Sequence, residues 1–397
     1  MREQIASDGD KSDSRSLRAS PRRVVQVVRP ATGGMRRHVS LLIVALDRTK
    51  FTPLLCAPAA FTLEEIPDRP ISPVQHIPLE IGARTRPLND LRAIAKLTRL
   101  LRSGRREPEG AIELVHAHGS RAALIGLLAA RRARLPGLFT AHNLLPPMGR
   151  ISRPLFRNVA NQATRVIAVS EAVARSLVAN GVSESRITVI SNGIDLLPFD
   201  EHKIGATTQD ESVRSRHTAA TAPTVVAIGR LSPEKGFDLL IDAFETVVQS
   251  VPDATLRIAG DGPERADLEA RASRSPVAER IRLLGRLDDT VPLLRSATVV
   301  AVPSRQEGQG LVALEAMAAR RPVVATAVGG LMETIVPNET GLLVSPESPV
   351  ALAEALVALL LTPERCRTFG ENGRQRVERH YTLERMMDKI QSLYASL

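Results

Sequence analysis

Short apolar segments alternate with helical patterns along nearly the whole chain, and this alternation limits the fold more than any other feature. Strands that alternate with helices form parallel sheets covered by helices on both faces. In the first half we expect strands at residues 22–28, 52–58, 74–79, 112–118, 137–142, 165–170 and 187–193. In the second half we expect strands at 224–230, 254–260, 281–286, 298–304, 322–328 and 341–345. The pattern predicts an α/β protein with two doubly wound sheets.

A polar stretch without periodicity, residues 203–223, separates the two sets of strands and is typical of a linker. A chain of 397 residues suits two domains of similar size. We therefore expect a disordered tail over 1–20, a first domain over 21–202, the linker over 203–223 and a second domain over 224–382. The last helical pattern, 383–397, has no strand after it.

Positive charge is concentrated in the first half of the chain. Residues 1–200 hold 30 Lys+Arg and 17 Asp+Glu, a net +13, and the remaining 23 Lys+Arg and 26 Asp+Glu give −3. This asymmetry indicates an anionic partner or surface for the first half, unless it reflects an arginine-rich composition alone. Nucleic acid is not the expected partner, because aromatic residues make up only 3% of the chain and tryptophan is absent.

We expect a cytoplasmic protein. Cys56 and Cys366 lie far apart and offer neither a disulfide framework nor a metal-binding spacing, which favours a reducing compartment. The N-terminal segment lacks the apolar core of a signal peptide. No apolar run approaches the roughly 18 residues of a membrane span.

Glycine and polar residues gather directly after the predicted strands. In open α/β sheets this edge is where ligands bind. Two such edges that face each other form one cleft between domains. The residues at these strand ends include Gly33, Gly34, His116, His118, His142, Ser170, Glu171, Arg230, Gly260 and Glu307.

The segment PSRQEGQGLVALEAMAARRPVV, residues 303–324, places a glycine turn before a helix that begins near Leu311. The unpaired N–H groups of Leu311 and Val312, together with the helix dipole, suit an anion. Gly308 and Gly310 allow the backbone to approach that anion, although many such turns are only tight turns.

Two cations lie in GRLSPEKG, residues 229–236. Arg230 and Lys235 are placed to straddle a diphosphate, or else they are ordinary surface charges. The glycine turn at Gly260 is either a plain β-to-α turn or an approach to a flat base.

Glu307 and Glu315 lie beside this anion site, although carboxylates repel anions. Carboxylates accept hydrogen bonds from hydroxyl groups, so they suit a ribose or a sugar. A diphosphate flanked by two sugars fits this layout, and such a ligand is a nucleotide-sugar.

These residues resemble a known family. The segment from PSRQEGQG to GLLVSP resembles the signature block of the family 4 retaining glycosyltransferases, whose Glu-x7-Glu motif matches Glu307 and Glu315. GRLSPEKG resembles the family's donor-phosphate segment. In the first half VVRPATGGMRRHV, LVHAHG, FTAHN and VISNGID resemble the family's glycine loop, histidine-bearing strand ends and exit strand. The resemblance covers about residues 22–397.

The resemblance implies a GT-B fold, in which two Rossmann-like doubly wound domains face a central cleft and the final helix, 383–397, packs back on the first domain. It implies that Gly34, with Gly33 before it, lies under the donor diphosphate and that His142 reaches the transferred sugar. It implies that Arg230 and Lys235 bind the diphosphate, Glu307 the sugar hydroxyls and Glu315 the ribose. From the glycine turns and the helix start described above, we also expect Gly260, Gly310, Leu311 and Val312 to belong to the donor site. Two departures are Gln309, where an aromatic residue is common, and Arg320-Arg321, where a glycine is usual.

The implied activity is a retaining transfer from a UDP- or GDP-linked sugar to a glycan, lipid-linked or small-molecule acceptor, in cell-envelope or polysaccharide synthesis. Cations and helix N–H groups stabilise the charge that grows on the leaving phosphate. We expect no cofactor and no catalytic metal, since Asp288-Asp289 resembles a helix N-terminal charge pair rather than a metal motif. A nucleotide-sugar epimerase of the same fold and a non-catalytic nucleotide-sugar sensor are the alternatives.

Three histidines outside the motif stay open. His116 and His118 lie on one face of their strand, as metal ligands do, but a third ligand is not evident and a structural role is favoured. His38, one helical turn after Gly34, is left without a role.

The helix expected over 88–107 is basic and amphipathic, with apolar residues at Leu88, Leu91, Ile94 and Leu101. It either docks peripherally on the inner, anionic face of a membrane or has one buried and one solvated face.

Overall fold

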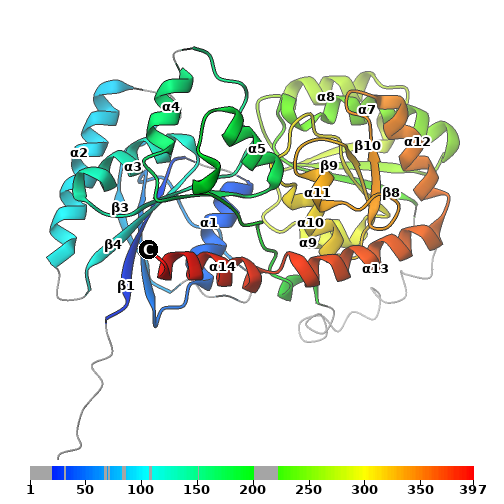
Figure 1. Ribbon diagram of the computed structural model, residues 1–397. Coiled ribbons are helices and arrows are strands. Elements are labelled where there is room, and N and C mark those ends of the chain that lie inside the picture. Colours follow the sequence, from blue (N-terminus) through cyan, green and yellow to red (C-terminus); the bar gives the residue numbers. More distant parts are fainter. Residues whose placement is uncertain are drawn as a thin grey trace, which may run out of the picture.

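The computed structural model describes residues 20–30, 33–66, 69, 72–82, 86–106, 110–150, 152–200 and 222–397. The expected tail and linker lie almost wholly outside these residues. The described residues form two parallel sheets flanked by helices, and the two resulting α/β domains lie side by side (Figure 1). The predicted class, α/β with two doubly wound sheets, is confirmed.

The first sheet has the strand order β3-β2-β1-β4-β5-β6-β7, all parallel. Its strands are β1 (Arg22–Val28), β2 (Phe51–Ala57), β3 (Gln75–Pro78), β4 (Ile112–His118), β5 (Gly137–Ala141), β6 (Arg165–Ala168) and β7 (Ile187–Val189). The helices between them are α1 (Gly34–Ala45), α2 (Pro87–Ser103), α3 (Ser120–Ala133), α4 (Ser152–Ala160) and α5 (Glu171–Ala179). Apolar residues cover both faces of this sheet, which explains why its strands read as continuous apolar runs.

The second sheet has the order β10-β9-β8-β11-β12-β13. Its strands are β8 (Thr224–Ile228), β9 (Thr255–Ala259), β10 (Ile281–Gly285), β11 (Val299–Val302), β12 (Val323–Thr326) and β13 (Gly341–Val344). Its helices are α7 (Phe237–Ser250), α8 (Arg265–Arg274), α9 (Val291–Ser296), α10 (Leu311–Ala318), α11 (Leu331–Thr334), α12 (Pro349–Leu360) and α13 (Pro363–His380), and α14 (Leu383–Ala395) follows them.

Every expected strand is present, but most are shorter than expected, and the difference is largest for the strand expected over 187–193, which is β7. Hydrogen bonding to β6 ends where the Ile190 N–H donates to the Ala168 carbonyl at 2.9 Å, and the chain then leaves the sheet toward the second domain. The sequence pattern misses this end because the apolar run continues into the crossing segment.

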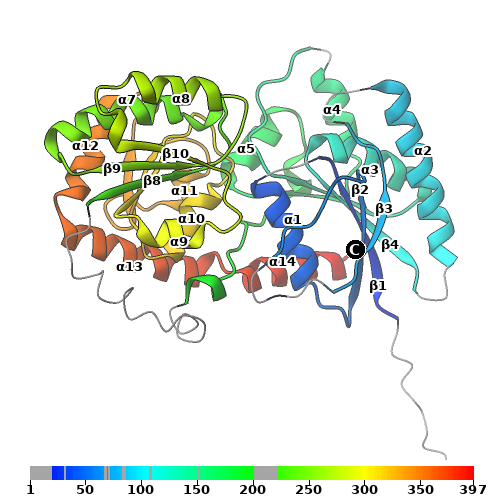
Figure 2. The same cartoon turned by 180° about the vertical axis from the view of Figure 1, so that it is seen from behind.

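The chain passes between the domains twice, and the two passages lie side by side. The Ile194 N–H donates to the Tyr381 carbonyl at 2.8 Å, and the Leu383 N–H donates to the Ile194 carbonyl at 3.0 Å. After the return passage, α14 packs on α1 and the first sheet through buried Met386, Ile390 and Tyr394. Figures 1 and 2 both show α13 under the second domain and α14 under the first.

We expect Gly193→Ala to weaken the docking of α14. A Cβ at Gly193 would lie 2.4 Å from the Thr382 carbonyl oxygen and 2.7 Å from Leu383 Cα, both backbone atoms. Overpacking of this kind costs about 1–3 kcal/mol, and denaturant unfolding measures it. Gly149→Ala is the control, because the nearest atom to its Cβ would be Ser152 Oγ at 3.9 Å. Equal stability of the two variants would contradict the crowding.

Candidate active site

The glycine turn before α10 brings the second domain directly onto the first. Gly310 has φ 90°, in the left-handed region that favours glycine, and precedes the helix that begins at Leu311. A Cβ on Gly308 would lie 2.2 Å from the His142 carbonyl oxygen, and a Cβ on Gly34 would lie 2.9 Å from Leu311 Cδ1. Backbone of the first domain therefore excludes a side chain at position 308, whereas one at position 34 would press on the Leu311 side chain. The N-terminal ends of α1 and α10 meet.

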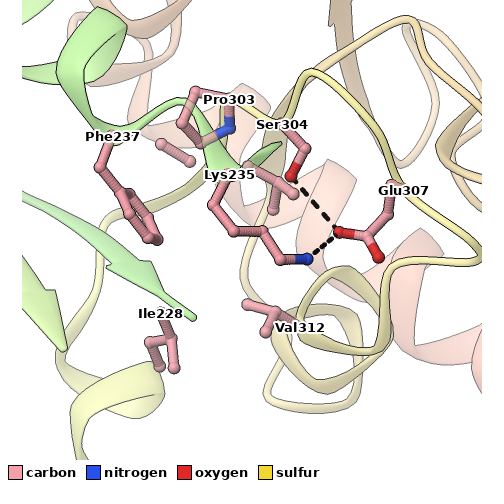
Figure 3. Close-up of a pocket in the computed structure, with 9 residues that line it drawn as sticks. Ile228, Lys235, Phe237, Pro303, Ser304, Glu307 and Val312 are labelled. Atoms are coloured by element: carbon pink, nitrogen blue, oxygen red, sulfur yellow. Dashed lines mark hydrogen bonds and ion pairs between the residues drawn. The ribbon is translucent and has the colours of Figure 1, made fainter. Parts of the chain in front are cut away.

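Lys235 and Glu307 form an ion pair beside a small pocket. Lys235 Nζ donates to Glu307 Oε2 at 2.5 Å, and Ser304 Oγ donates to the same oxygen at 3.3 Å. Gly236, with φ 66°, allows the tight approach, since a Cβ there would lie 2.1 Å from the Pro303 carbonyl oxygen. Figure 3 shows the pair beside an apolar wall that includes Ile228, Phe237 and Val312.

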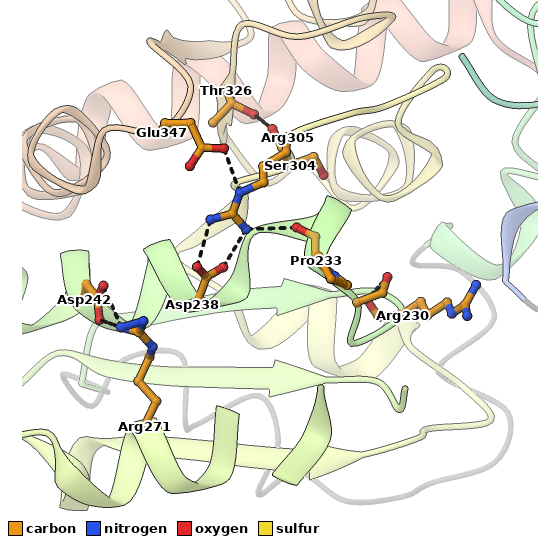
Figure 4. A network of polar contacts seen from close by, with 10 residues as sticks. Arg230, Pro233, Asp238, Asp242, Arg271, Ser304, Arg305, Thr326 and Glu347 are labelled. Atoms are coloured by element: carbon orange, nitrogen blue, oxygen red, sulfur yellow. Dashed lines mark hydrogen bonds and ion pairs between the residues drawn. The ribbon is translucent and has the colours of Figure 1, made fainter. Parts of the chain in front are cut away.

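Arg305 ties the loop before α10 to α7. Its guanidinium donates to both carboxylate oxygens of Asp238 at 2.8 Å, to Glu347 at 2.7 Å and to the Pro233 carbonyl at 2.9 Å (Figure 4). These bonds raise the pKa of Arg305. The network joins the segment that holds Lys235 to the loop that holds Glu307, so both are positioned together.

Arg230 stands apart from this network. Figure 4 shows its side chain extending away from the Arg305 carboxylates, and it is exposed. Burial, and then the positive charges of Arg230 and Arg121, lower the pKa of Arg29 at the end of β1. Arg230 therefore faces the first domain near Arg29 and Arg121, and this grouping of positive charges favours an anion.

Glu315 lies in the seam between the domains, where the N-terminal ends of α1 and α10 meet. It is paired with a residue of the first domain. Arg37 on α1 lies 3.2 Å from Glu315 Oε1 and also donates to Glu64 at 3.0 Å. Glu315 is 7% exposed. Burial raises its pKa, although the Arg37 charge opposes the shift. Sequence reasoning missed Arg37, because no local pattern indicates a pairing that depends on how the domains meet.

His142 lies against His38 and His118 under the same edge. The ring centroids of His38 and His142 are 4.7 Å apart, and His118 Nδ1 lies 3.4 Å from His142 Nε2. His116 lies behind them, with Nε2 2.7 Å from Thr140 Oγ1 and Nδ1 2.6 Å from the Tyr394 hydroxyl. Burial lowers the pKa of His38 to about 4 and of His116 to about 3. These histidines are neutral at pH 7.

Gln309 stands where the resemblance leads one to expect an aromatic residue, and it joins the domains. Its Oε1 accepts bonds from the Asn192 N–H and from Asn192 Nδ2, both at 2.7 Å. Ser170 Oγ donates to the Gly308 carbonyl at 2.6 Å, and Glu333 accepts from the N–H groups of Glu171 and Ala172, at the start of α5. In the sequence, the only indication of the contacts at Gly308 and Glu333 is that Ser170 and Glu171 follow a strand.

Gly33 and Gly260, the remaining residues predicted to bind the donor, differ in whether packing explains why a glycine stands there. Gly33 has φ 61° and precedes α1, and among the described residues no atom lies within 4 Å of where its Cβ would be. Close backbone packing explains the glycine at position 260, because a Cβ there would lie 1.8 Å from the Gly229 carbonyl oxygen. The Arg320 departure places an arginine at φ 56°, the strained position after α10 where glycine is favoured.

Acid should destabilise the protein through its buried histidines. Their folded pKa values are depressed below the unfolded value near 6.5, so their stabilising contribution is full above pH 6.5. It is lost as pH falls to about 4 for His38 and to about 3 for His116. The expected loss is about 1.4 kcal/mol per pH unit for each histidine. Urea unfolding at several pH values measures how the free energy of unfolding changes with pH. His116→Gln should reduce this slope by the contribution of about one proton. An unchanged slope in the variant would show that His116 is already protonated in the folded state.

Comparison with known proteins agrees with this geometry. The family model described as Glycosyltransferase Family 4 matches residues 32–196, and the model described as Glycosyl transferases group 1 matches residues 208–376. An uncharacterized glycosyltransferase of Methanocaldococcus jannaschii is 27% identical over 93% of this chain and 96% of its own length. A D-inositol 3-phosphate glycosyltransferase of Rhodococcus jostii is 31% identical over 74% of this chain and 69% of its own length.

Among solved structures, Anabaena HepE in complex with UDP-glucose superposes with a TM-score of 0.76 at 23% identity, covering 94% of this chain and 100% of that one. At this identity the likeness shows the fold, and the expected GT-B arrangement is confirmed. The two family models together span both domains. The chain belongs to glycosyltransferase family 4.

Proposed function

We propose that the protein is a retaining glycosyltransferase that moves a sugar from a UDP- or GDP-linked donor to a glycan, lipid-linked or small-molecule acceptor in cell-envelope or polysaccharide synthesis. The observation that carries the proposal is the Lys235–Glu307 pair beside the N-terminus of α10, in the seam between the domains. HepE, which shares the fold, binds UDP-glucose, and the Rhodococcus relative is a sugar transferase; both support this class of donor and reaction.

In this proposal the donor diphosphate lies at the start of α10. Arg230, Lys235 and the N–H groups of Leu311 and Val312 neutralise it. Lys235 then exchanges part of its bond to Glu307 for a phosphate oxygen, which frees Glu307 to accept bonds from sugar hydroxyls.

Glu315 binds the ribose diol, and Arg37, 3.2 Å from its carboxylate, opposes the effect of burial on its charge. Gly33 and Gly34 lie under the diphosphate, where the open space beside Gly33 leaves room for it. The turn at Gly260 flanks the base.

The transfer step uses the donor's own phosphate. The bond from the anomeric carbon to the phosphate oxygen breaks, and the acceptor oxygen bonds to that carbon on the same face. The acceptor's proton passes to the departing phosphate, so neither a protein base nor a metal ion is required. Neutral His142 contacts the sugar, and Arg230 and Lys235 hold the charge that grows on the leaving group.

We expect Lys235→Ala to weaken binding of its nucleotide-sugar by about tenfold or more, because a charge-assisted hydrogen bond contributes about 1.5–3 kcal/mol. A panel of UDP- and GDP-sugars is first tested by thermal shift and by slow donor hydrolysis, and calorimetry then compares the variants. Lys389→Ala, at an exposed lysine of α14, is the matched control. If no nucleotide-sugar binds, the proposed activity is wrong. Binding with no hydrolysis or transfer would favour a sensor.

We further propose that the first domain contacts an anionic membrane that carries a lipid-linked acceptor. Of the apolar residues expected to line the helix, Ile94 and Leu101 are buried in α2, whereas Leu88 and Leu91 are 72% and 59% exposed. Exposed arginines flank them, and α4 adds exposed Leu155 between further arginines. No helix among the described residues is long and apolar enough to cross a bilayer.

The double variant Arg92→Glu with Arg99→Glu, both on α2, should reduce binding to vesicles of phosphatidylglycerol and phosphatidylcholine at least tenfold. Each basic residue near an anionic surface contributes about 1 kcal/mol, and each reversal adds repulsion. Vesicle sedimentation measures the partition. The control reverses Arg274 and Arg282, which are exposed on the second domain. A similar loss in both double variants would indicate a charge effect without a defined surface.

A further inference from the structure

Three histidines from different elements converge under the edge of the first sheet. His38 lies on α1, His118 ends β4 and His142 follows β5. One ring nitrogen of each lies within 4.8 Å of the others, and the distance from His118 Nδ1 to His142 Nε2 is 3.4 Å. His38 and His118 are buried, whereas His142 is partly exposed. Sequence analysis identified His118 as a candidate ligand but lacked a third one.

The hydrogen bonds of His38 determine which of its nitrogens carries the proton. Asn192 Nδ2 donates to Gln309 Oε1, which leaves Asn192 Oδ1 as an acceptor. His38 Nδ1 lies 2.7 Å from that oxygen and therefore carries the hydrogen. The lone pair is then on His38 Nε2, which is buried without a hydrogen-bond partner among the described residues.

His118 is oriented by the same logic. Gln26 Nε2 donates to the Tyr394 hydroxyl at 3.1 Å, so Gln26 Oε1 is free to accept. His118 Nε2 lies 2.9 Å from Gln26 Oε1 and carries the hydrogen. Its lone pair is on Nδ1, the atom that faces His142.

Two buried lone pairs are therefore held beside His142 by carboxamide groups. An N–H on His142 Nε2 would donate to the lone pair of His118 Nδ1. The lone pair of His38 Nε2 would then have no donor among the described residues. An unsatisfied buried acceptor is costly. Imidazole lone pairs that are fixed by hydrogen bonds on the opposite nitrogen are the arrangement in which proteins hold transition metals.

We propose that His38 Nε2, His118 Nδ1 and His142 Nε2 bind one Zn²⁺ ion, with a fourth position open toward the cleft beside His142. Zinc bonds imidazole at about 2.0–2.1 Å, so ring rotations that bring the three nitrogens closer together complete the site. His142 supplies its Nε2 lone pair by moving its proton to Nδ1.

Burial lowers the pKa of all three rings, so the neutral form that a metal requires is already present at pH 7. The positive charge of Arg29 acts on His142 and opposes a bound cation, which weakens the affinity. Zinc would also hold His142 away from the sugar and inhibit transfer. That consequence rests on the proposed function, whereas the site itself does not.

The test uses the full chain without an affinity tag, stripped with a chelator. Calorimetry with Zn²⁺ should show one ion per chain, and Co²⁺ should give the visible absorption of a four-coordinate site. His38→Gln and His118→Gln should each weaken binding at least tenfold. His380→Gln, at an exposed histidine of α13, should leave binding unchanged.

Nitrogen NMR of the histidine rings in the unaltered protein makes the test independent of how the variants fold. Zinc should shift His38 Nε2 and His118 Nδ1 and leave the protonated nitrogens of those rings attached to hydrogen. Shifts confined to other histidines, zinc binding equal in the His38 and His380 variants, or no binding at all would overturn the proposal.

Discussion

Close backbone contact between the two domains is the constraint on which the candidate site depends. Gly308 has no room for a side chain because backbone of the first domain occupies it, and Gly34 lies against the Leu311 side chain of the second domain. This contact sets the first turn of α1 against the first turn of α10. Two helix N-termini that meet present positive partial charges to each other, so the seam attracts negative charge. The structure fills that need with carboxylates at its edges, and the diphosphate that we propose as a ligand would meet it directly.

The carboxylates explain how the seam remains stable without a ligand. Glu307 pairs with Lys235 within one domain, and Glu315 pairs with Arg37 across the two. A buried charge left unpaired costs several kcal/mol, so each group that we assign to a donor has an internal partner. Donor affinity is therefore a difference between two sets of bonds, and tight binding requires that the diphosphate replace these partners with better ones.

The sequence predicted the sheets well because their strands are buried on both faces, and such strands appear as uninterrupted apolar runs. β1 and β4 have the expected ends, whereas β7 is shorter because its apolar run leads into the crossing between domains. The Glu307 and Lys235 positions followed from local motifs. Arg37, Asn192 and Glu333 did not, because their partners lie more than one hundred residues away and no periodicity records such pairings.

The histidines also show that a sequence pattern does not reveal contacts between distant segments. A strand pattern places His116 and His118 on one face, but only the packed helix α1 brings His38 to them. Gln26 and Tyr394, which orient His118, come from the first strand and the last helix.

The return of the last helix to the first sheet has a consequence for how such enzymes diversify. Tyr394 and its neighbours on α14 complete a core whose other residues lie before residue 200. A chimera that joins the first half of this chain to the second half of a relative would carry a foreign final helix against its own first sheet. Recombination that preserves a folded first domain must therefore exchange an internal segment and keep α14 together with the first sheet.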